Sequence, residues 1–280
     1  MTDSLSTGID FIYFNACAYC VVFREESGQV YRFFVTSEQI YGSHAEITGD
    51  DVNHIRNVLR MEPGEKVVIS CGRGMDYHCR IREIQTDAVY LDIEREEPVR
   101  TELPVKLVLF QALPKADKME FIIQKAVELG AAQVVPVRTR RSVVKLDEKK
   151  AAKKTQRWRA IAEAAAKQSG RGIIPEVHDI VCFSEALELA KELDLTLIPY
   201  ELYDDMAETV RTIQKAEKRK SIGIFIGPEG GFERGEVEKA MENGAIPVSL
   251  GKRILRTETA GIAILSVLMF GIEGENAGEE

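Results

Sequence analysis

Ser221-Ile222-Gly223-Ile224-Phe225-Ile226 runs directly into Gly227-Pro228-Glu229-Gly230-Gly231, and this junction decides the fold. A short apolar run that ends at a cluster of turn residues is typical of a buried strand followed by a tight loop. Two further apolar runs, at residues 195–200 and 246–250, also end in polar or glycine-containing segments. We therefore predict that the C-terminal half of the chain alternates between strands and helices.

The alternation begins at residue 106, where an apolar run opens the second half of the chain. Repeated strand–helix units favour an α/β fold, in which a parallel sheet carries helices on both faces. Ligands of such sheets bind beyond the carboxyl ends of the strands, where the 227–231 loop and the 250–260 segment lie. The expected strands are 106–113, 132–137, 195–200, 221–226 and 246–250, and the expected helices are 117–129, 148–168, one after each of the strands ending at 200 and 226, and 258–270.

Residues 30–99 show a different pattern of short alternating runs and turns, which predicts a small β-rich domain, a barrel. Its clearest strands are expected at 66–70, 77–84 and 88–94. The charged, proline-flanked stretch 94–104 is expected to be the linker to the second domain at 104–275.

A short helix is expected early in the β-rich domain, after Asp50 or Asp51, either of which can cap it. Arg56 and Arg60 are spaced one helical turn apart and are expected to share an outer face. The expected apolar stripe is Ile55, Val58 and Leu59.

Residues 1–29 are expected to be a weakly ordered extension that precedes the folded domain. The apolar stretch 9–23 is short for a membrane span and is interrupted by Asn15. It also lacks a basic region before it, which makes it a poor signal peptide. We therefore expect a cytoplasmic protein with no membrane attachment.

The composition is that of an ordinary soluble protein, with 45% hydrophobic and 29% charged residues among 280. Of the five cysteines, Cys17 and Cys20 form a CxxC pair, but no second pair completes a zinc site. We therefore expect neither a bound metal nor a disulfide framework.

The formal net charge of −8 argues against nucleic-acid binding, but the charge is unevenly distributed. Residues 138–171 hold twelve lysines and arginines and three acids, a net charge of +9, so the rest of the chain carries −17. A local basic patch can bind phosphate on an otherwise acidic protein. The alternative interpretation is a solvated helix face, above all for Lys149, Lys150, Lys153 and Lys154. Trp158 continues an apolar stripe with Ile161, Ala162 and Ala165, so we expect it in the core.

The 227–231 loop resembles a phosphate loop only superficially. It matches neither common phosphate-binding motif, and Pro228 has no N–H to donate. Glu229, Glu233 and Glu236 bring negative charge to the position where an anion would otherwise bind. A ligand without phosphate, such as a cation, suits this loop better. S-adenosylmethionine (SAM), with its sulfonium, is such a ligand, and a purely structural turn is the alternative.

The second candidate segment, residues 250–260, combines basic and apolar residues before a final helix that is apolar almost all round. Thr257 can cap that helix, and we expect the helix to be buried in the core or against another subunit. Arg253 and Arg256 either form structural pairs with glutamates or serve a ligand.

Together these strings resemble the bacterial 16S rRNA (uridine-N3) methyltransferases, RsmE-type, of the SPOUT (trefoil-knot) superfamily. The strings that carry the resemblance span about residues 31–272 in the family's order. They are His54-Ile-Arg-Asn-Val-Leu-Arg-Met61, Asp117-Lys-Met-Glu-Phe-Ile-Ile-Gln-Lys-Ala-Val-Glu-Leu-Gly130, Gln168-Ser-Gly-Arg171 with Pro175-Glu176, Ile226-Gly-Pro-Glu-Gly-Gly231 and Leu250-Gly-Lys-Arg-Ile-Leu-Arg-Thr-Glu-Thr-Ala260.

The resemblance implies a PUA-like β-barrel followed by a SPOUT trefoil-knotted parallel-sheet domain that acts as a homodimer. It implies that SAM lies in the knot between three loops. The cofactor-binding residues are then Ile198, Pro199, Ile226, Gly227, Pro228, Gly230, Leu250, Gly251, Ile254, Leu255 and Thr257. The RNA-binding residues are expected to be Arg32, Arg56, Arg60, Arg138, Arg140, Arg141, Lys145 and Arg171.

The implied reaction methylates N3 of a specific uridine in 16S rRNA, with the assembled small ribosomal subunit as the expected substrate. Uridine N3 must lose a proton before it can attack, so the site needs a positive charge near O2 or O4 and a route for the proton. Arg256 is the candidate for the charge. Glu229 or Glu258 could accept the proton or orient Arg256. Action on another RNA site, or a non-catalytic RNA-binding role in ribosome assembly, are the alternatives.

Overall fold

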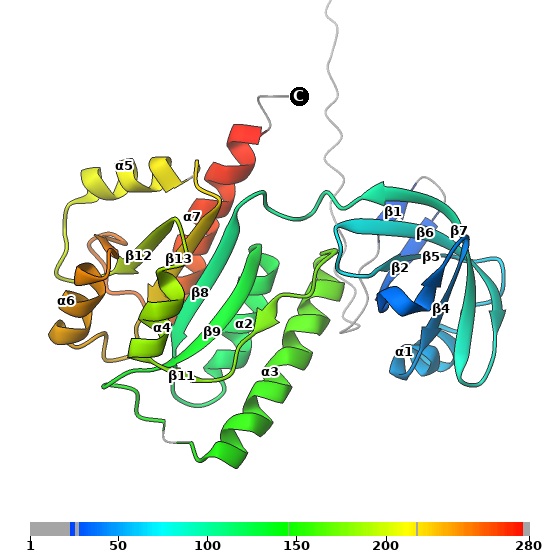
Figure 1. Cartoon of the computed structure of the whole chain (residues 1–280), viewed down its shortest axis with the longest axis horizontal. Helices are drawn as coiled ribbons and strands as arrows, with labels where there is room; N and C mark the ends of the chain where they lie inside the picture. The colour runs from blue at the N-terminus through cyan, green and yellow to red at the C-terminus, as the bar shows by residue number, and fades with distance from the viewer. Residues whose placement is uncertain (1–22, 26–27, 145, 217, 277–280) are drawn as a thin grey trace, which may run out of the picture.

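The computed structural model describes residues 23–25, 28–144, 146–216 and 218–276, which form two lobes joined by residues 99–105 (Figure 1). Cys17, Cys20, Lys145 and most of the predicted extension lie outside these residues. Of residues 1–29, Phe23–Glu25 forms a strand that pairs with the start of the next one. The elements of the first lobe are β1 (Phe23–Glu25), β2 (Gly28–Phe34), the 3-10 helix η1 (Ser37–Gln39), β3 (Ile40–Tyr41), β4 (His44–Thr48), α1 (Asp50–Asn53), the π-helix η2 (His54–Leu59), β5 (Lys66–Ser70), β6 (Met75–Ile84) and β7 (Ala88–Pro98).

The first lobe is a seven-stranded sheet around one apolar core. Its strand order is β1-β2-β5-β6-β7-β4-β3, with β2 and β5 parallel and the other neighbours antiparallel. Alternate residues of the strands, such as Phe33, Ile69 and Leu91, point into this core. The β-rich domain is therefore confirmed, although no pairing joins β1 to β3 among the described strands.

The short helix of the first lobe differs from its predicted form. Ile55 is fully buried, but Val58 is 52% exposed. The reason is that His54–Leu59 is π-helical, which widens the turn and rotates Val58 outward. Met61 fills the core instead, and Arg60 ends the helix in the left-handed region with φ 54°. The linker also begins later than the predicted residue 94, since β7 stays paired with β6 as far as Pro98.

The second lobe is an α/β fold, as predicted. Its sheet has the order β10-β9-β8-β13-β12-β14, with β11 also beside β9, and every pairing is parallel. The elements are β8 (Lys106–Ala112), α2 (Lys118–Glu128), β9 (Ala131–Arg138), α3 (Glu148–Gln168), β10 (Glu176–Val177), β11 (Val181–Cys182), α4 (Phe183–Ala190), β12 (Leu195–Pro199), α5 (Met206–Ala216), β13 (Ser221–Ile226), α6 (Arg234–Glu242), β14 (Ile246–Val248) and α7 (Thr257–Asn276).

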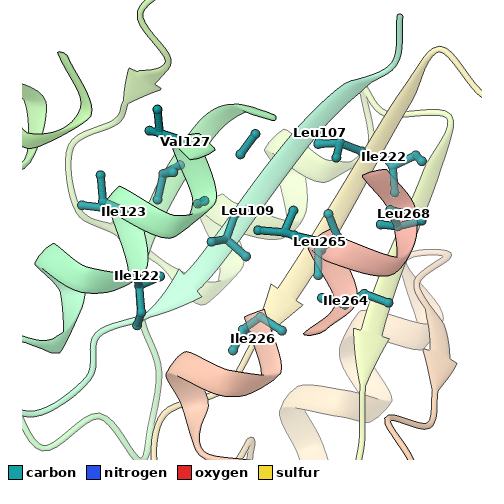
Figure 2. Packing of buried hydrophobic residues seen from close by; sticks show 14 of the residues in the cluster. Leu107, Leu109, Ile122, Ile123, Val127, Ile222, Ile226, Ile264, Leu265 and Leu268 are labelled. Atoms are coloured by element: carbon teal, nitrogen blue, oxygen red, sulfur yellow. The ribbon is translucent and has the colours of Figure 1, made fainter. Parts of the chain in front are cut away.

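Helices cover both faces of this sheet because successive strand residues point to opposite sides. Leu107 and Leu109 of β8 pack with α2, α3 and α7 (Figure 2), whereas Val108 and Phe110 pack with α4 and α6. Trp158 of α3 is 2% exposed in the first of these cores, which confirms its predicted structural role. The trefoil knot stays a prediction from the resemblance, since strand order defines neighbours and not the threading of the chain.

The final helix α7 is buried along one side only. Ile264, Leu265 and Leu268 lie in the core, but Val267 is 49% and Phe270 72% exposed. By length and composition alone α7 could cross a membrane, a test that core helices of soluble proteins also pass. About a third of that stretch is buried, and α7 packs against α2, α5 and β13.

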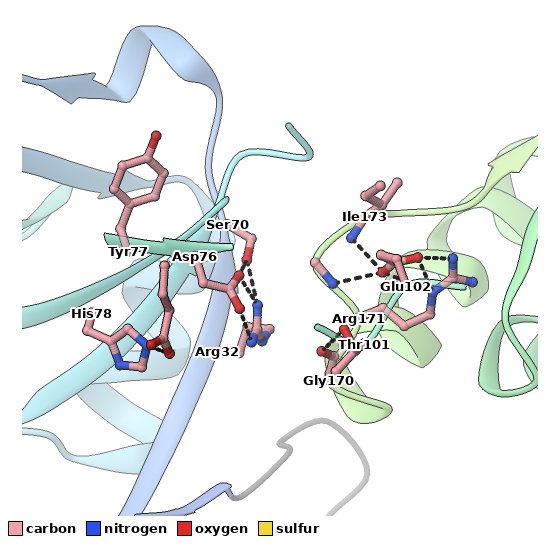
Figure 3. A network of polar contacts seen from close by, with 12 residues as sticks. Arg32, Ser70, Asp76, Tyr77, His78, Thr101, Glu102, Gly170, Arg171 and Ile173 are labelled. Atoms are coloured by element: carbon pink, nitrogen blue, oxygen red, sulfur yellow. Dashed lines mark hydrogen bonds and ion pairs between the residues drawn. The ribbon is translucent and has the colours of Figure 1, made fainter. Parts of the chain in front are cut away.

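Arg171, in the predicted motif at residues 168–171, anchors the connection between the lobes (Figure 3). Its guanidinium is 5% exposed, forms an ion pair with Glu102 of the linker and donates a hydrogen bond to the carbonyl of Val127. Thr101 Oγ1 also donates to the carbonyl of Gly170, 3.0 Å away. A Cβ at Gly172 would lie 2.3 Å from a methyl carbon of Val99, so only glycine fits under the linker.

We predict that Arg171→Ala lowers the free energy of unfolding by about 3–5 kcal/mol, because it leaves the largely buried Glu102 carboxylate without its cation. Urea unfolding followed by circular dichroism measures this. Arg211→Ala removes an exposed pair within α5 and should cost at most about 0.5 kcal/mol. Equal effects of the two changes would contradict the role assigned to Arg171.

Candidate functional site

The parallel strands β8, β13, β12 and β14 lie side by side, so the loops after them gather at one edge of the sheet. These loops are residues 113–117, 227–231, 200–205 and 249–256. The two segments that the sequence singled out are therefore brought to the same edge. They are not adjacent in the sheet, since β12 lies between β13 and β14, so the 249–256 segment crosses the end of β12 to reach β13.

A hydrogen-bond chain fixes the end of that crossing. Thr257 Oγ1 donates to the carbonyl oxygen of Gly227 at 2.6 Å and accepts from Gln111 Nε2 at 2.9 Å. Gln111 is fully buried in β8, and its Oε1 has no hydrogen-bond partner among the described residues. Thr257 is the first residue of α7, and these two hydrogen bonds tie the start of the helix to the glycine loop and to β8.

An ion cluster joins the same loops a few residues away. Lys118 Nζ lies 3.1 Å from Glu229 Oε1 and 3.3 Å from Glu258 Oε2. The backbone N–H of Lys115 donates to the same oxygen of Glu229 at 3.0 Å. The cluster therefore connects the start of α2, the glycine loop and the first turn of α7.

The hydrogen bonds of this cluster favour its charged forms. Partial burial alone would raise the pKa of Glu229, but hydrogen bonds from backbone N–H groups and from Lys118 hold it below its ordinary value. The hydrogen bond to Glu229 raises the pKa of Lys118 against the opposing effect of desolvation. At neutral pH both groups are therefore ionised. Glu258 Oε2 is buried and has the ammonium of Lys118 nearby but no well-directed hydrogen bond.

Arg256 lies next to this cluster in sequence and is exposed. Its side chain takes part in none of the hydrogen bonds or ion pairs that the described residues form, and the same holds for Arg253. The alternative prediction, that these arginines form structural pairs with glutamates, is therefore wrong for the described residues. The cation that pairs with Glu229 and Glu258 is Lys118.

Glycine allows the 227–231 loop to turn back closely on its own backbone. A Cβ at Gly227 would lie 3.2 Å from the backbone nitrogen of Phe232, and Gly231 has φ 66°, a conformation that favours glycine. The Gly231 position also lies against the Glu201 carboxylate, which belongs to the loop after β12. The loop after β12 therefore contacts the glycine loop, which the backbone of Lys115 also joins to the loop after β8.

The other predicted cofactor-binding residues fall into three groups by exposure. Ile198, Ile226 and Pro228 are buried, so they could offer a ligand mainly backbone groups. Ile254 is 95% exposed and Gly230 is exposed. The remaining residues are half-buried: Pro199, Leu250, Gly251 and Leu255.

The basic loop after β9 borders the glycine loop. Arg141 donates from its guanidinium to the carbonyl of Gly230 at 2.8 Å. Arg140 forms an ion pair with Glu233 at 3.1 Å while its side chain stays 76% exposed. Arg138 is also exposed. A cationic surface therefore lies directly beside the candidate ligand site.

Comparison with known families identifies the two lobes. A model described as an RNA methyltransferase domain matches residues 101–269, and one described as an RNA methyltransferase PUA domain matches residues 47–94. The chain belongs to this RNA methyltransferase family.

Individual relatives of this methyltransferase agree. The ribosomal RNA small subunit methyltransferase E of Bacillus subtilis (strain 168) is 38% identical over 86% of this chain and 97% of the relative. The Neisseria gonorrhoeae protein of the same name, solved with bound SAM, is 32% identical with a TM-score of 0.74, over 85% of this chain and 95% of that one. A SAM complex from Legionella pneumophila has a TM-score of 0.74 and 35% identity, over 85% and 96%. The resemblance inferred from the motifs is confirmed.

Two arginines that were predicted to contact RNA are buried in the structure of the methyltransferase. Arg32 is buried in the first lobe, where it forms an ion pair with Asp76 and a hydrogen bond with Ser70 (Figure 3). Arg171 is the buried anchor of the linker. Neither guanidinium is presented to solvent, so both act in the fold. Arg56 and Arg60 are exposed.

The long helix α3 contributes less free positive charge than its sequence suggests. Several of its basic side chains are paired with acids from other elements, as in Lys154 with Asp117, Arg157 with Glu120 and Lys167 with Asp51. The solvated-face interpretation therefore holds for much of this helix. The basic loop at 138–141 remains the part of the stretch that borders the candidate site of the methyltransferase.

Sequence reasoning missed Lys118 and Gln111 as members of the site. Lys118 lies inside a string that supported the resemblance, but nothing local marks it as the partner of two distant glutamates. Gln111 lies next to the end of the apolar strand β8. A polar residue within such an apolar run was the signal available in the sequence.

Proposed function

We propose that this chain uses SAM to methylate N3 of a specific uridine in 16S rRNA. The observation that carries the proposal is the meeting of the glycine loop with the start of α7, held by Thr257 and Lys118. The family membership and the two relatives solved with SAM support the cofactor and the class of reaction.

The chemistry of the site fits SAM better than a phosphate-bearing cofactor. Glu229 and Glu258 outnumber Lys118 in the ion cluster, so the cluster itself is net negative and suits a sulfonium cation. The glycine loop, residues 227–231, lies beside this cluster at the carboxyl end of β13. Backbone groups of this loop and of 250–255 would hold SAM, which when bound supplies an electrophilic methyl group.

The side chains divide the remaining tasks. Arg256 is exposed beside the cluster and permanently charged, so it can stabilise the negative charge that develops on a uridine oxygen when N3 loses its proton. Of the two glutamates, Glu258 has the less satisfied carboxylate, since its buried Oε2 accepts no hydrogen bond among the described residues, and we assign it the proton-accepting role. Glu229 is held by Lys115 and Lys118 and serves as an anchor.

We predict that Arg256→Ala reduces methylation of small ribosomal subunits at least 100-fold and leaves SAM affinity within about twofold, because the charge acts on the uridine. The substrate is subunits from a strain that lacks the modification, and product nucleosides are identified by mass spectrometry. SAM affinity is measured by isothermal titration, with Arg234→Ala, an exposed residue of α6, as the matched control.

Near wild-type turnover of the Arg256 variant would contradict its role. A methylated sugar, or methylation of tRNA alone, would overturn the proposed substrate. Absence of SAM binding by the wild-type protein would favour a non-catalytic assembly factor.

The basic loop is proposed to bind rRNA phosphates next to the reaction site, together with Arg56 and Arg60 of the first lobe. Arg138, Arg140 and Arg141 project from the end of β9 beside the glycine loop. Lys145 is proposed to bind phosphate as well, because it follows these arginines in the same basic stretch of the sequence. Such contacts position RNA without reading its sequence.

We predict that Arg140→Ala weakens binding of a 16S rRNA fragment several-fold and reduces the slope of log affinity against log salt by about one. Fluorescence anisotropy at several salt concentrations measures this. Arg211→Ala, on α5, is the control. An unchanged slope would contradict a phosphate contact at Arg140.

We further propose that the enzyme works as a cytoplasmic homodimer. The contacting helices α2 and α7 expose Phe121, Val267 and Phe270, which are 45%, 49% and 72% accessible. Large apolar side chains gathered on packed helices mark an association surface. A second copy of the chain, which carries the same surface, would cover it.

We predict that Phe270→Lys converts the protein to a monomer, because it places a charge on the proposed apolar interface. Sedimentation velocity measures the mass. Leu189→Lys, at an exposed apolar position of α4 on the opposite face of the sheet, is the control and should leave the dimer intact. A wild-type monomer would overturn this assembly.

A further inference from the structure

Lys118 is the single side chain that contacts both glutamates of the site among the described residues. It is the first residue of α2, and its ammonium reaches Glu229 of the glycine loop and Glu258 of α7. These two carboxylates belong to segments 29 positions apart in sequence. Their relative position therefore depends on a group from a third element.

Two alternatives for this task are excluded by the contacts. Lys115 approaches Glu229 through its backbone N–H, and its side chain forms no ion pair with either glutamate. Arg256 is exposed and pairs with neither. Without Lys118, the two carboxylates would have no cation between them, and the buried Oε2 of Glu258 would lose the one ion pair that it forms among the described residues.

We propose that Lys118 is a positioning residue of the reaction: it locks the 227–231 loop to the first turn of α7 and thereby sets the cofactor pocket and the placement of Arg256. The inference rests on the proposed function. Lys118 acts through Glu229 and Glu258 and does not itself need to touch the uridine. Because its pKa is raised by its hydrogen bond to Glu229, the ammonium stays charged throughout the neutral range.

This lock complements the hydrogen bond between Thr257 and Gly227. That bond joins the same two segments through neutral groups, on the side where Gln111 of β8 is buried. The ion cluster joins them from the side of α2. Loss of Lys118 should therefore loosen the pocket without unfolding the domain, because the Thr257 connection and the surrounding core remain.

The test compares Lys118→Met, Lys118→Gln and Lys118→Arg with Lys191→Met. Lys191 pairs with Glu188 of α4, so its ion pair links no loops. The measurements are the thermal midpoint, the Kd of SAM by isothermal titration, and kcat and the two KM values on small ribosomal subunits. Glutamine keeps a hydrogen-bond donor without the charge, and it provides a second neutral variant where methionine impairs folding.

We predict that the neutral variants raise the Kd and KM of SAM about tenfold and lower kcat about tenfold, while the KM for subunits stays within about twofold. Lys118→Arg should recover at least half of each loss, and Lys191→Met should match the wild type. A folded neutral variant with wild-type SAM affinity and kcat would overturn the proposal. So would an arginine variant as impaired as the neutral ones.

The two proposals fail in distinguishable ways. If the wild-type protein binds SAM but does not methylate small subunits, the proposed substrate fails, and the SAM affinities of the Lys118 variants still decide this inference. If the wild type methylates subunits and the neutral variants do so equally well, the proposed function stands and the role of Lys118 is rejected.

Discussion

The parallel pairing of β8, β13, β12 and β14 is the constraint on which the site depends. It places the carboxyl ends of these strands at one edge and brings together loops that are far apart in sequence. The chain must then pass from β14 across β12 to begin α7 beside β13. Thr257 and Lys118 hold the end of this crossing by two different interactions, one neutral and one charged.

The same constraint explains which parts of the fold could be predicted from sequence. Strands such as 66–70 and 221–226 and the helix at 148–168 have local periodicity, and the structure reproduces their limits. The failures lie where a non-local or unusual geometry decides. Val58 points outward because the helical turn that contains it is π-helical, and β7 extends to Pro98 because β6 supplies a partner.

The candidate site also has a part that the sequence predicts and a part that it does not. The loops that form it could be predicted, since each directly follows an apolar strand in sequence. The individual roles of charged side chains could not. Arg32 and Arg171 were predicted to contact RNA from the sequence. In the structure they pair with Asp76 and Glu102, which lie 44 and 69 residues away in the chain. Lys118 could not be assigned because Glu229 lies 111 positions further along the chain.

Charge pairing finally separates the roles that the sequence left open. Glu229 accepts a backbone hydrogen bond and an ion pair, which stabilises its ionised form and makes it a weak base. Glu258 shares the same ammonium but lacks a directed hydrogen bond. Arg256 is exposed and pairs with no acid among the described residues, which is why we propose that its charge serves the substrate. Lys118 contacts both carboxylates, and this partly exposed ion cluster leaves Arg256 outside its ion pairs.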